Sequence, residues 1–162
     1  KEECRTAMVD AASAVTAASV AWRSPDDYSV LSFGKEVVAA KSQDAHKSNE
    51  SVVDAVLALR GFGTTDVAGA LAAARDQLGR SSAARKITIL LSDCRATAHG
   101  SGDAESAIGV AIAARQVEEL LIIAPADDDV AARQLAAATG SRITTVTGPS
   151  DAAAALARVL DT

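Results

Sequence analysis

Two short runs of apolar residues constrain the fold of this chain most strongly. The first is ITILL at 87–91, and the second is LLIIA at 120–124. A strand that is apolar on both sides is typical of a parallel sheet with both faces covered by helices. A third strand pattern, RITTV, occupies 142–146, and helical patterns lie between and after these runs. The alternating order from Lys86 onward therefore predicts an α/β fold with a mostly parallel sheet and helices on both faces.

Shorter patterns predict the remaining elements. Apolar positions recur at three- and four-residue steps, as in helices that bury one face. This periodicity predicts helices at 4–22, 51–60, 67–78, 103–116, 127–139 and 150–160. Two strand patterns at 28–33 and 36–40, joined at Gly34, predict one antiparallel hairpin. Ser48 or Asn49 is expected to cap the helix that follows it.

Length and composition narrow the classes of protein. The 162 residues suit a single domain over 1–162, and the 49% of hydrophobic residues can form its core. A net charge of -5 does not favour nucleic acid as a partner. No apolar run reaches the roughly 20 residues that a membrane span needs. Cys4 and Cys94 show no metal-binding or disulfide spacing, which indicates a reducing, cytoplasmic compartment.

Two segments supply candidate functional residues. Asp93 follows the apolar strand at 87–91 directly, and ligands of open α/β sheets bind at the carboxyl ends of strands. The segment GFGTT at 61–65 precedes a helix, so we expect it on the same rim. A threonine hydroxyl and a carboxylate that meet there would suit Mg²⁺, which prefers oxygen ligands.

The motifs GTTDVAGAL at 63–71 and ILLSDC at 89–94 resemble the second and third metal-site motifs of von Willebrand factor A (VWA) domains. The order of the predicted elements is similar over essentially the whole chain. The resemblance implies a Rossmann-like, three-layer VWA fold in which Thr65 and Asp93 bind the metal. It also implies a partner-binding rim that comprises Gly63, Thr64, Asp66, Cys94, Arg95 and His99.

The function implied by the resemblance is non-enzymatic protein binding. In VWA domains a divalent cation, Mg²⁺ or Mn²⁺, keeps an open coordination position that a partner's Asp or Glu fills. The alanine-rich helices and the segment LLSDCRAT at 90–97 are most similar to those of bacterial intracellular VWA domains. Those domains accompany AAA+ ATPases of the chelatase and MoxR types, so an AAA+ ATPase is an expected partner.

The chain departs from the family pattern in two places. The first metal-site motif, Asp-x-Ser-x-Ser, is absent from the sequence, and the family places it on a central strand just before the position of Lys1. We therefore expect that strand to come from an upstream segment or from a separate chain. Cys94 stands where the family has glycine. The alternative is a metal-independent structural or regulatory domain of an AAA+ assembly.

Simpler roles remain open for each candidate residue. Thr65 could be the N-cap of the following helix, and Asp66 could be a first-turn acid favoured by the helix dipole. Asp93 could form a turn, and Cys94 could be a small half-buried residue or a reactive thiol. An enzyme or a nucleotide binder is a third possibility, but the sequence carries no phosphate loop and no nucleophile elbow.

Overall fold

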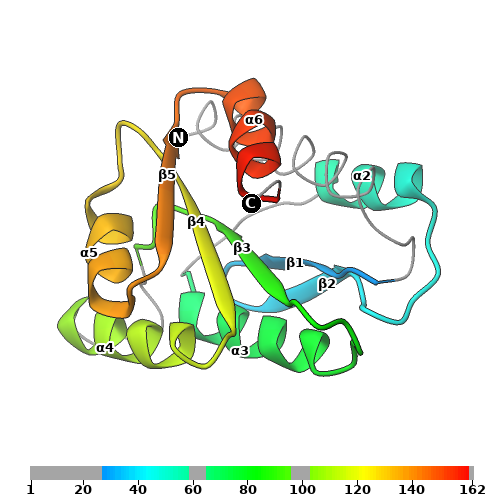
Figure 1. Cartoon of the computed structure of the whole chain (residues 1–162), viewed down its shortest axis with the longest axis horizontal. Coiled ribbons are helices and arrows are strands. Elements are labelled where there is room, and N and C mark those ends of the chain that lie inside the picture. Colours follow the sequence, from blue (N-terminus) through cyan, green and yellow to red (C-terminus); the bar gives the residue numbers. More distant parts are fainter. Residues whose placement is uncertain (1–26, 59–64, 96–102, 161–162) are drawn as a thin grey trace.

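The computed structural model describes residues 27–58, 65–95 and 103–160 (Figure 1). For residues 103–106, 149–150 and 159–160 it describes the backbone alone. The helix expected at 4–22 lies outside the described residues. Within them, the chain is α/β, as the alternation of apolar runs predicts.

The C-terminal half forms a parallel sheet with the strand order β3-β4-β5. Its strands are β3 (Ile87–Leu91), β4 (Glu119–Pro125) and β5 (Arg142–Val146). The five central residues of β4 are all buried, as expected for a strand between two helical layers. The three strands therefore confirm the prediction of a parallel sheet.

Helices cover both faces of this sheet. On one face, α3 (Val67–Leu78), α4 (Asp103–Ala114) and α5 (Val130–Thr139) join β3 and β4 in the larger core cluster. On the other face, α6 (Pro149–Leu160) packs Ala152 and Leu156 against Leu121 and Ile123 of β4. Alternate residues of β4 thus contribute to two separate clusters, because successive strand side chains point to opposite faces.

The predicted hairpin forms between β1 (Val30–Phe33) and β2 (Val37–Lys41). The VWA fold implied by the resemblance is a single, mostly parallel sheet that includes one antiparallel hairpin strand. Instead, the described strands form two sheets, because β1 pairs with β2 and β3 pairs with β4 without any pairing between the sheets. The described residues also contain no counterpart of the central strand that the resemblance implies. Only the coarser α/β prediction is therefore confirmed.

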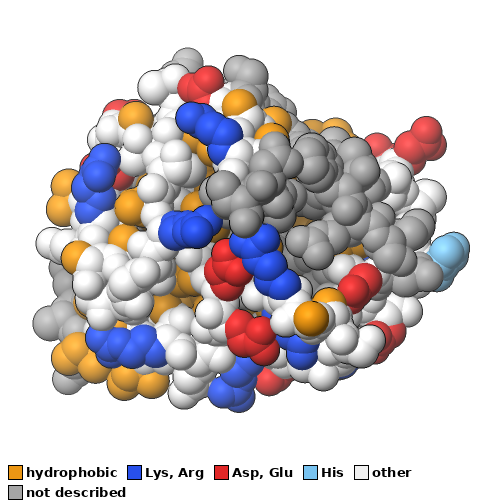
Figure 2. Space-filling model, viewed as in Figure 1, with side chains coloured by type: hydrophobic (Ala, Val, Ile, Leu, Met, Phe, Trp, Pro, Cys, Tyr) orange, Lys and Arg blue, Asp and Glu red, His pale blue; other side chains and the backbone are white. Residues whose placement is uncertain are grey.

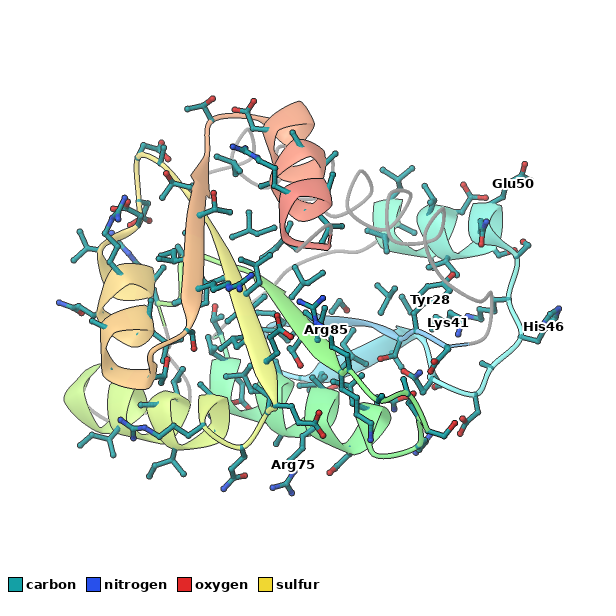
Figure 3. All side chains as sticks on the ribbon, viewed as in Figure 1. Tyr28, Lys41, His46, Glu50, Arg75 and Arg85 are labelled. Carbon is teal, nitrogen blue, oxygen red and sulfur yellow. The ribbon has the colours of Figure 1, made fainter. Side chains whose placement is uncertain are left out.

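A buried lysine fixes the end of the hairpin. The Lys41 side chain is fully buried, and its Nζ donates hydrogen bonds to the carbonyl oxygens of Tyr28 (2.7 Å) and Ser42 (3.1 Å). The same Nζ lies 4.3 Å from the centre of the Tyr28 ring. Figure 3 labels the two side chains. These contacts offset the cost of removing an ammonium group from water.

The remaining boundaries differ slightly from the predictions. Helix α2 (Asn49–Leu57) begins after Ser48, whose hydroxyl accepts a bond from the Ser51 N–H, so Ser48 is its N-cap. Helix α5 begins three residues later than predicted, because the Asp128 N–H bonds to the Pro125 carbonyl in a turn. The described helices have at most 12 residues, and none is both long and apolar enough to cross a bilayer.

Candidate functional site

The site is built on the end of β3. The Ser92 N–H donates to the Ile123 carbonyl of β4 (3.1 Å), so the sheet pairing continues to the residue before Asp93. The Asp93 carboxylate then accepts a hydrogen bond at Oδ1 from the Arg95 N–H (2.9 Å). An aspartate that bonds the backbone two residues later forms a local turn. The structure therefore confirms the turn-forming role of Asp93 and places it at the carboxyl edge.

Cys94 adopts an unusual backbone conformation. Its φ angle is 60°, the only positive φ of a non-glycine residue in the described part of the chain. Glycine adopts this conformation without steric strain, whereas for other residues it is less stable by about 1–2 kcal/mol. Its N–H donates to the Ser92 hydroxyl (2.9 Å), which holds the turn. This backbone position accordingly suits the glycine that the family resemblance places there.

The Cys94 side chain is buried rather than half-buried. It belongs to the same core cluster as Val67 and Leu71 of α3. Burial, followed by the nearby charge of Asp93, raises the pKa of the thiol to about 12. The thiolate is the nucleophilic and metal-binding form of cysteine. The protonated thiol therefore packs as a core residue, and this burial favours a structural role over a reactive thiol.

Arg95 links the ends of two neighbouring strands. Its Nη2 donates to Oδ1 of Asp128 at 2.6 Å, and Asp128 lies in the turn after β4. Asp93, Arg95 and Asp128 together form what we call the carboxyl rim. From sequence, the acids at 127–129 are expected only to favour the start of a helix through its dipole, although Asp128 follows a buried strand as Asp93 does. That parallel position was the signal that could have identified it.

Asp66 has a structural role in the described contacts. It is the N-cap of α3, because its Oδ1 accepts a hydrogen bond from the Gly69 N–H (2.8 Å). Its own N–H donates to the Gly34 carbonyl in the hairpin (2.8 Å). The predictions of a Thr65 cap and of a first-turn Asp66 are therefore wrong. Asp66 itself has non-helical backbone angles (φ -94°, ψ 79°), so the helix begins at Val67.

Thr65 is half-buried and directly precedes Asp66. Where α3 begins therefore decides whether Thr65 lies near the rim. In Figure 1, α3 begins on the side of the molecule toward which β3 ends. Val67 of α3 and Cys94 also share one core cluster. These observations place the start of α3 near the carboxyl edge. The other rim candidates, Gly63, Thr64 and His99, lie outside the described residues.

The described residues do not complete a magnesium site. Within 27–58, 65–95 and 103–160, no group of three or more His, Cys, Asp or Glu side chains could hold a metal ion. Asp66 is engaged in its helix cap, which leaves Thr65 and Asp93 as the oxygen ligands implied by the resemblance. Mg²⁺ takes six oxygen ligands, several of them waters, so these two residues would need ligands from elsewhere.

A hollow of about 650 Å³ lies at the opposite edge of the sheet, beside the starts of β4 and β5. Arg85, labelled in Figure 3, donates to both carboxylate oxygens of Glu119 (2.8 and 2.9 Å). This bond lowers the pKa of Glu119. Arg115 donates to the Ala138 carbonyl near the end of α5. These charged groups join neighbouring elements, so we assign them a structural role.

Comparison with known proteins identifies no relative of this chain, since no family model, no curated protein and no solved structure matches it.

Proposed function

We propose that this chain is a non-catalytic protein-interaction domain and that the carboxyl rim is its contact surface. The backbone of Cys94 carries this proposal. Non-glycine residues in the left-handed backbone conformation are found mainly at functional sites, where the surrounding structure holds them in place. Here the strained residue sits between Asp93 and Arg95, the two charged members of the rim that follow β3.

The residues around the strained position support binding over catalysis. Ser92 is buried, and its hydroxyl accepts the Cys94 N–H. Burial raises the pKa of the Cys94 thiol to about 12, so the thiol remains protonated near neutral pH. A catalytic serine or cysteine needs an activated oxygen or sulfur. Both side chains instead stabilise the turn that holds Asp93 in place.

The rim presents one basic side chain, Arg95, beside the two acids Asp93 and Asp128. The Arg95 side chain is 64% exposed while it bonds Asp128. An exposed ion pair contributes at most about 1 kcal/mol, so an incoming carboxylate can compete for the guanidinium. We therefore propose a protein partner that presents an Asp or Glu to Arg95. The family resemblance makes an AAA+ ATPase the first class of partner to test.

A metal-assisted form of the same contact is the second candidate. The oxygen ligands Thr65 and Asp93 favour it, because the start of α3 and the end of β3 lie on one side of the molecule. A partner carboxylate would then complete the coordination of Mg²⁺ or Mn²⁺. Calorimetric titration of Mn²⁺ into the wild-type protein and Asp93→Ala tests this form. Saturable binding that Asp93→Ala abolishes supports it, whereas heats that are the same in both proteins contradict it.

The main proposal is tested by quantitative affinity purification from the source cells. The wild-type chain is compared with Asp93→Ala and with Asp54→Ala, which removes an exposed acid from α2. We expect a partner that the wild type and Asp54→Ala retain and that Asp93→Ala loses. Addition of a chelator should release this partner only if the contact is metal-assisted. Recovery of the same partners in equal amounts by all three proteins would contradict the proposed contact surface.

A further inference from the structure

The hollow at the starts of β4 and β5 is lined by three arginines that come from three separate segments. Arg85 precedes β3, Arg115 directly follows α4, and Arg142 is the first residue of β5. Figure 1 shows that β4 and β5 begin beside the ends of α4 and α5. In that part of the molecule, Figure 2 shows basic side chains on several sides of a mostly uncharged area. The fold thus gathers positive charge here, although the whole chain has a net charge of -5.

The two acids that line the hollow do not cancel this charge. Three arginines and two glutamates, Glu118 and Glu119, give the lining a net charge of +1. The hydrogen bonds from Arg85, together with the charges of Arg85 and Arg142, hold the pKa of Glu119 below its usual range. Glu119 is therefore already ionised and paired at neutral pH, and positive charge remains for a ligand.

Two of the guanidinium groups are held in place by bonds that use few of their donors. A guanidinium carries five N–H donors. Arg85 donates to Glu119 from Nε and Nη2, and Arg115 donates to the Ala138 carbonyl from Nη2. These three bonds use three of the ten donors of the two side chains. The bonds that join elements of the fold thus also position both groups beside the hollow, with donors left for a ligand.

Another part of the lining is apolar and buried. Ala114, Val117 and Leu120 contribute to it, and none of them is more than 8% exposed. Sites for small molecules combine apolar surface with a few well-placed polar groups and usually measure about 300–1,000 Å³. The volume of about 650 Å³ and the mixed lining therefore suit a small molecule that is partly apolar and partly charged.

We propose that this hollow binds a small organic anion, whose phosphate or carboxylate group is bound by the arginines and whose apolar part lies against Val117 and Leu120. The planar fork of arginine matches both kinds of group, because two parallel N–H donors meet two oxygens. The site lies at the opposite edge of the sheet from the carboxyl rim, so this proposal is independent of the proposed contact surface.

Titration of the ¹⁵N-labelled protein with phenyl phosphate and, separately, with benzoate tests the proposal by two-dimensional NMR. The two probes share an apolar ring and differ in the charged group, so the tighter one identifies the preferred anion. We expect saturable shifts of the backbone amides of 139–142, with a dissociation constant in the millimolar range for such small probes. Benzyl alcohol, which has the ring without the charge, should shift these amides far less.

Substitution of the arginines tests which side chains bind the anion. Arg115→Gln and Arg142→Gln should each weaken binding at least about tenfold, since each removes charge-assisted hydrogen bonds. The matched control is Arg133→Gln, which removes an arginine near the start of α5, 60% exposed and paired with Asp129. The dispersion of the amide signals checks that each variant is folded.

Three outcomes would overturn the proposal. The first is a wild-type protein whose amides at 139–142 show no saturable shift with either probe up to about 10 mM. The second is equal weakening by Arg133→Gln and by the variants of the hollow. The third is a folded Arg115→Gln and a folded Arg142→Gln that both bind as the wild type does.

Discussion

The contact between Asp66 and Gly69 makes a sharp prediction about the start of α3. Alanine in place of glycine usually stabilises a helix by about 0.5–1 kcal/mol. At Gly69, however, a Cβ atom would lie 2.3 Å from Oδ2 and 2.8 Å from Cγ of Asp66. The Asp66 carboxylate must then leave the Gly69 N–H, and the loss of an N-cap bond costs about 1 kcal/mol. Gly69→Ala should therefore be neutral or destabilising in the wild type.

Gly69→Ala should instead raise the free energy of unfolding when the Asp66 cap is absent. In Asp66→Ala, no carboxylate opposes the new Cβ, so Gly69→Ala should stabilise the protein by about 0.5–1 kcal/mol. The double-mutant cycle thus predicts a coupling energy of about 1 kcal/mol between the two positions. Gly109→Ala is the matched control, because its Cβ would meet no atom within 4 Å.

Urea unfolding of the four proteins of the cycle, at low protein concentration, gives the required free energies. If Gly69→Ala raised the free energy of unfolding equally in the presence and absence of the Asp66 carboxylate, the reasoning would fail. Asp66 would then have no capping role, and its side chain would be available to the candidate site.

Three further predictions concern buried and paired charges. Burial raises the pKa of the Cys94 thiol from 9.0 to about 12. The contribution of this thiol to the free energy of unfolding is therefore fully present below about pH 9 and falls as pH rises toward 12. Unfolding of a Cys4→Ser variant, in which Cys94 is the remaining cysteine, measures this across that pH range. Lys41→Ala should lower the free energy of unfolding by about 1.5–3 kcal/mol in a denaturant titration, since it removes buried charge-assisted hydrogen bonds. Arg85→Met should lower the free energy of unfolding by less than about 1 kcal/mol, because the ion pair of Arg85 with Glu119 is partly exposed. Added salt should reduce this difference between the variant and the wild type.

The strands of the parallel sheet were predictable because their signal is local. The apolar run at 87–91 forms β3, and RITTV forms β5 with the expected boundaries. Helix α3 also has the predicted extent, because its periodic apolar residues end at Gly79, which is its C-cap. In each of these segments, local propensity and burial favour the same structure.

The features that sequence analysis missed depend on contacts between distant segments. Thr65 and Asp66 are both good N-cap residues; the cap is Asp66, whose own N–H also bonds the distant Gly34 in the hairpin. The pairing of Arg95 with Asp128 joins residues 33 positions apart. The sequence contains no local signal for either contact. The separation of the hairpin from the parallel sheet is a long-range property of the same kind.

The candidate site was predictable in position but not in chemistry. A polar residue after a buried parallel strand indicates the carboxyl edge, and Asp93 lies there. The sequence does not reveal that Asp66 is engaged in a cap or that Cys94 is buried, because both facts depend on how α3 packs. These two contacts engage two members of the predicted partner-binding rim in the structure itself, which favours a contact surface made of the paired charges nearby.

The central claim is that the carboxyl rim contacts a partner, and photo-crosslinking in the source cells tests it most directly. A photoreactive amino acid replaces Asp127, an exposed residue beside Asp128, or, as the control, Asp54 on α2. The account predicts a discrete crosslinked protein from position 127 that is absent from position 54, and its loss when Asp93→Ala is added. The same adducts from both positions, or an adduct at 127 that Asp93→Ala leaves unchanged, would contradict it.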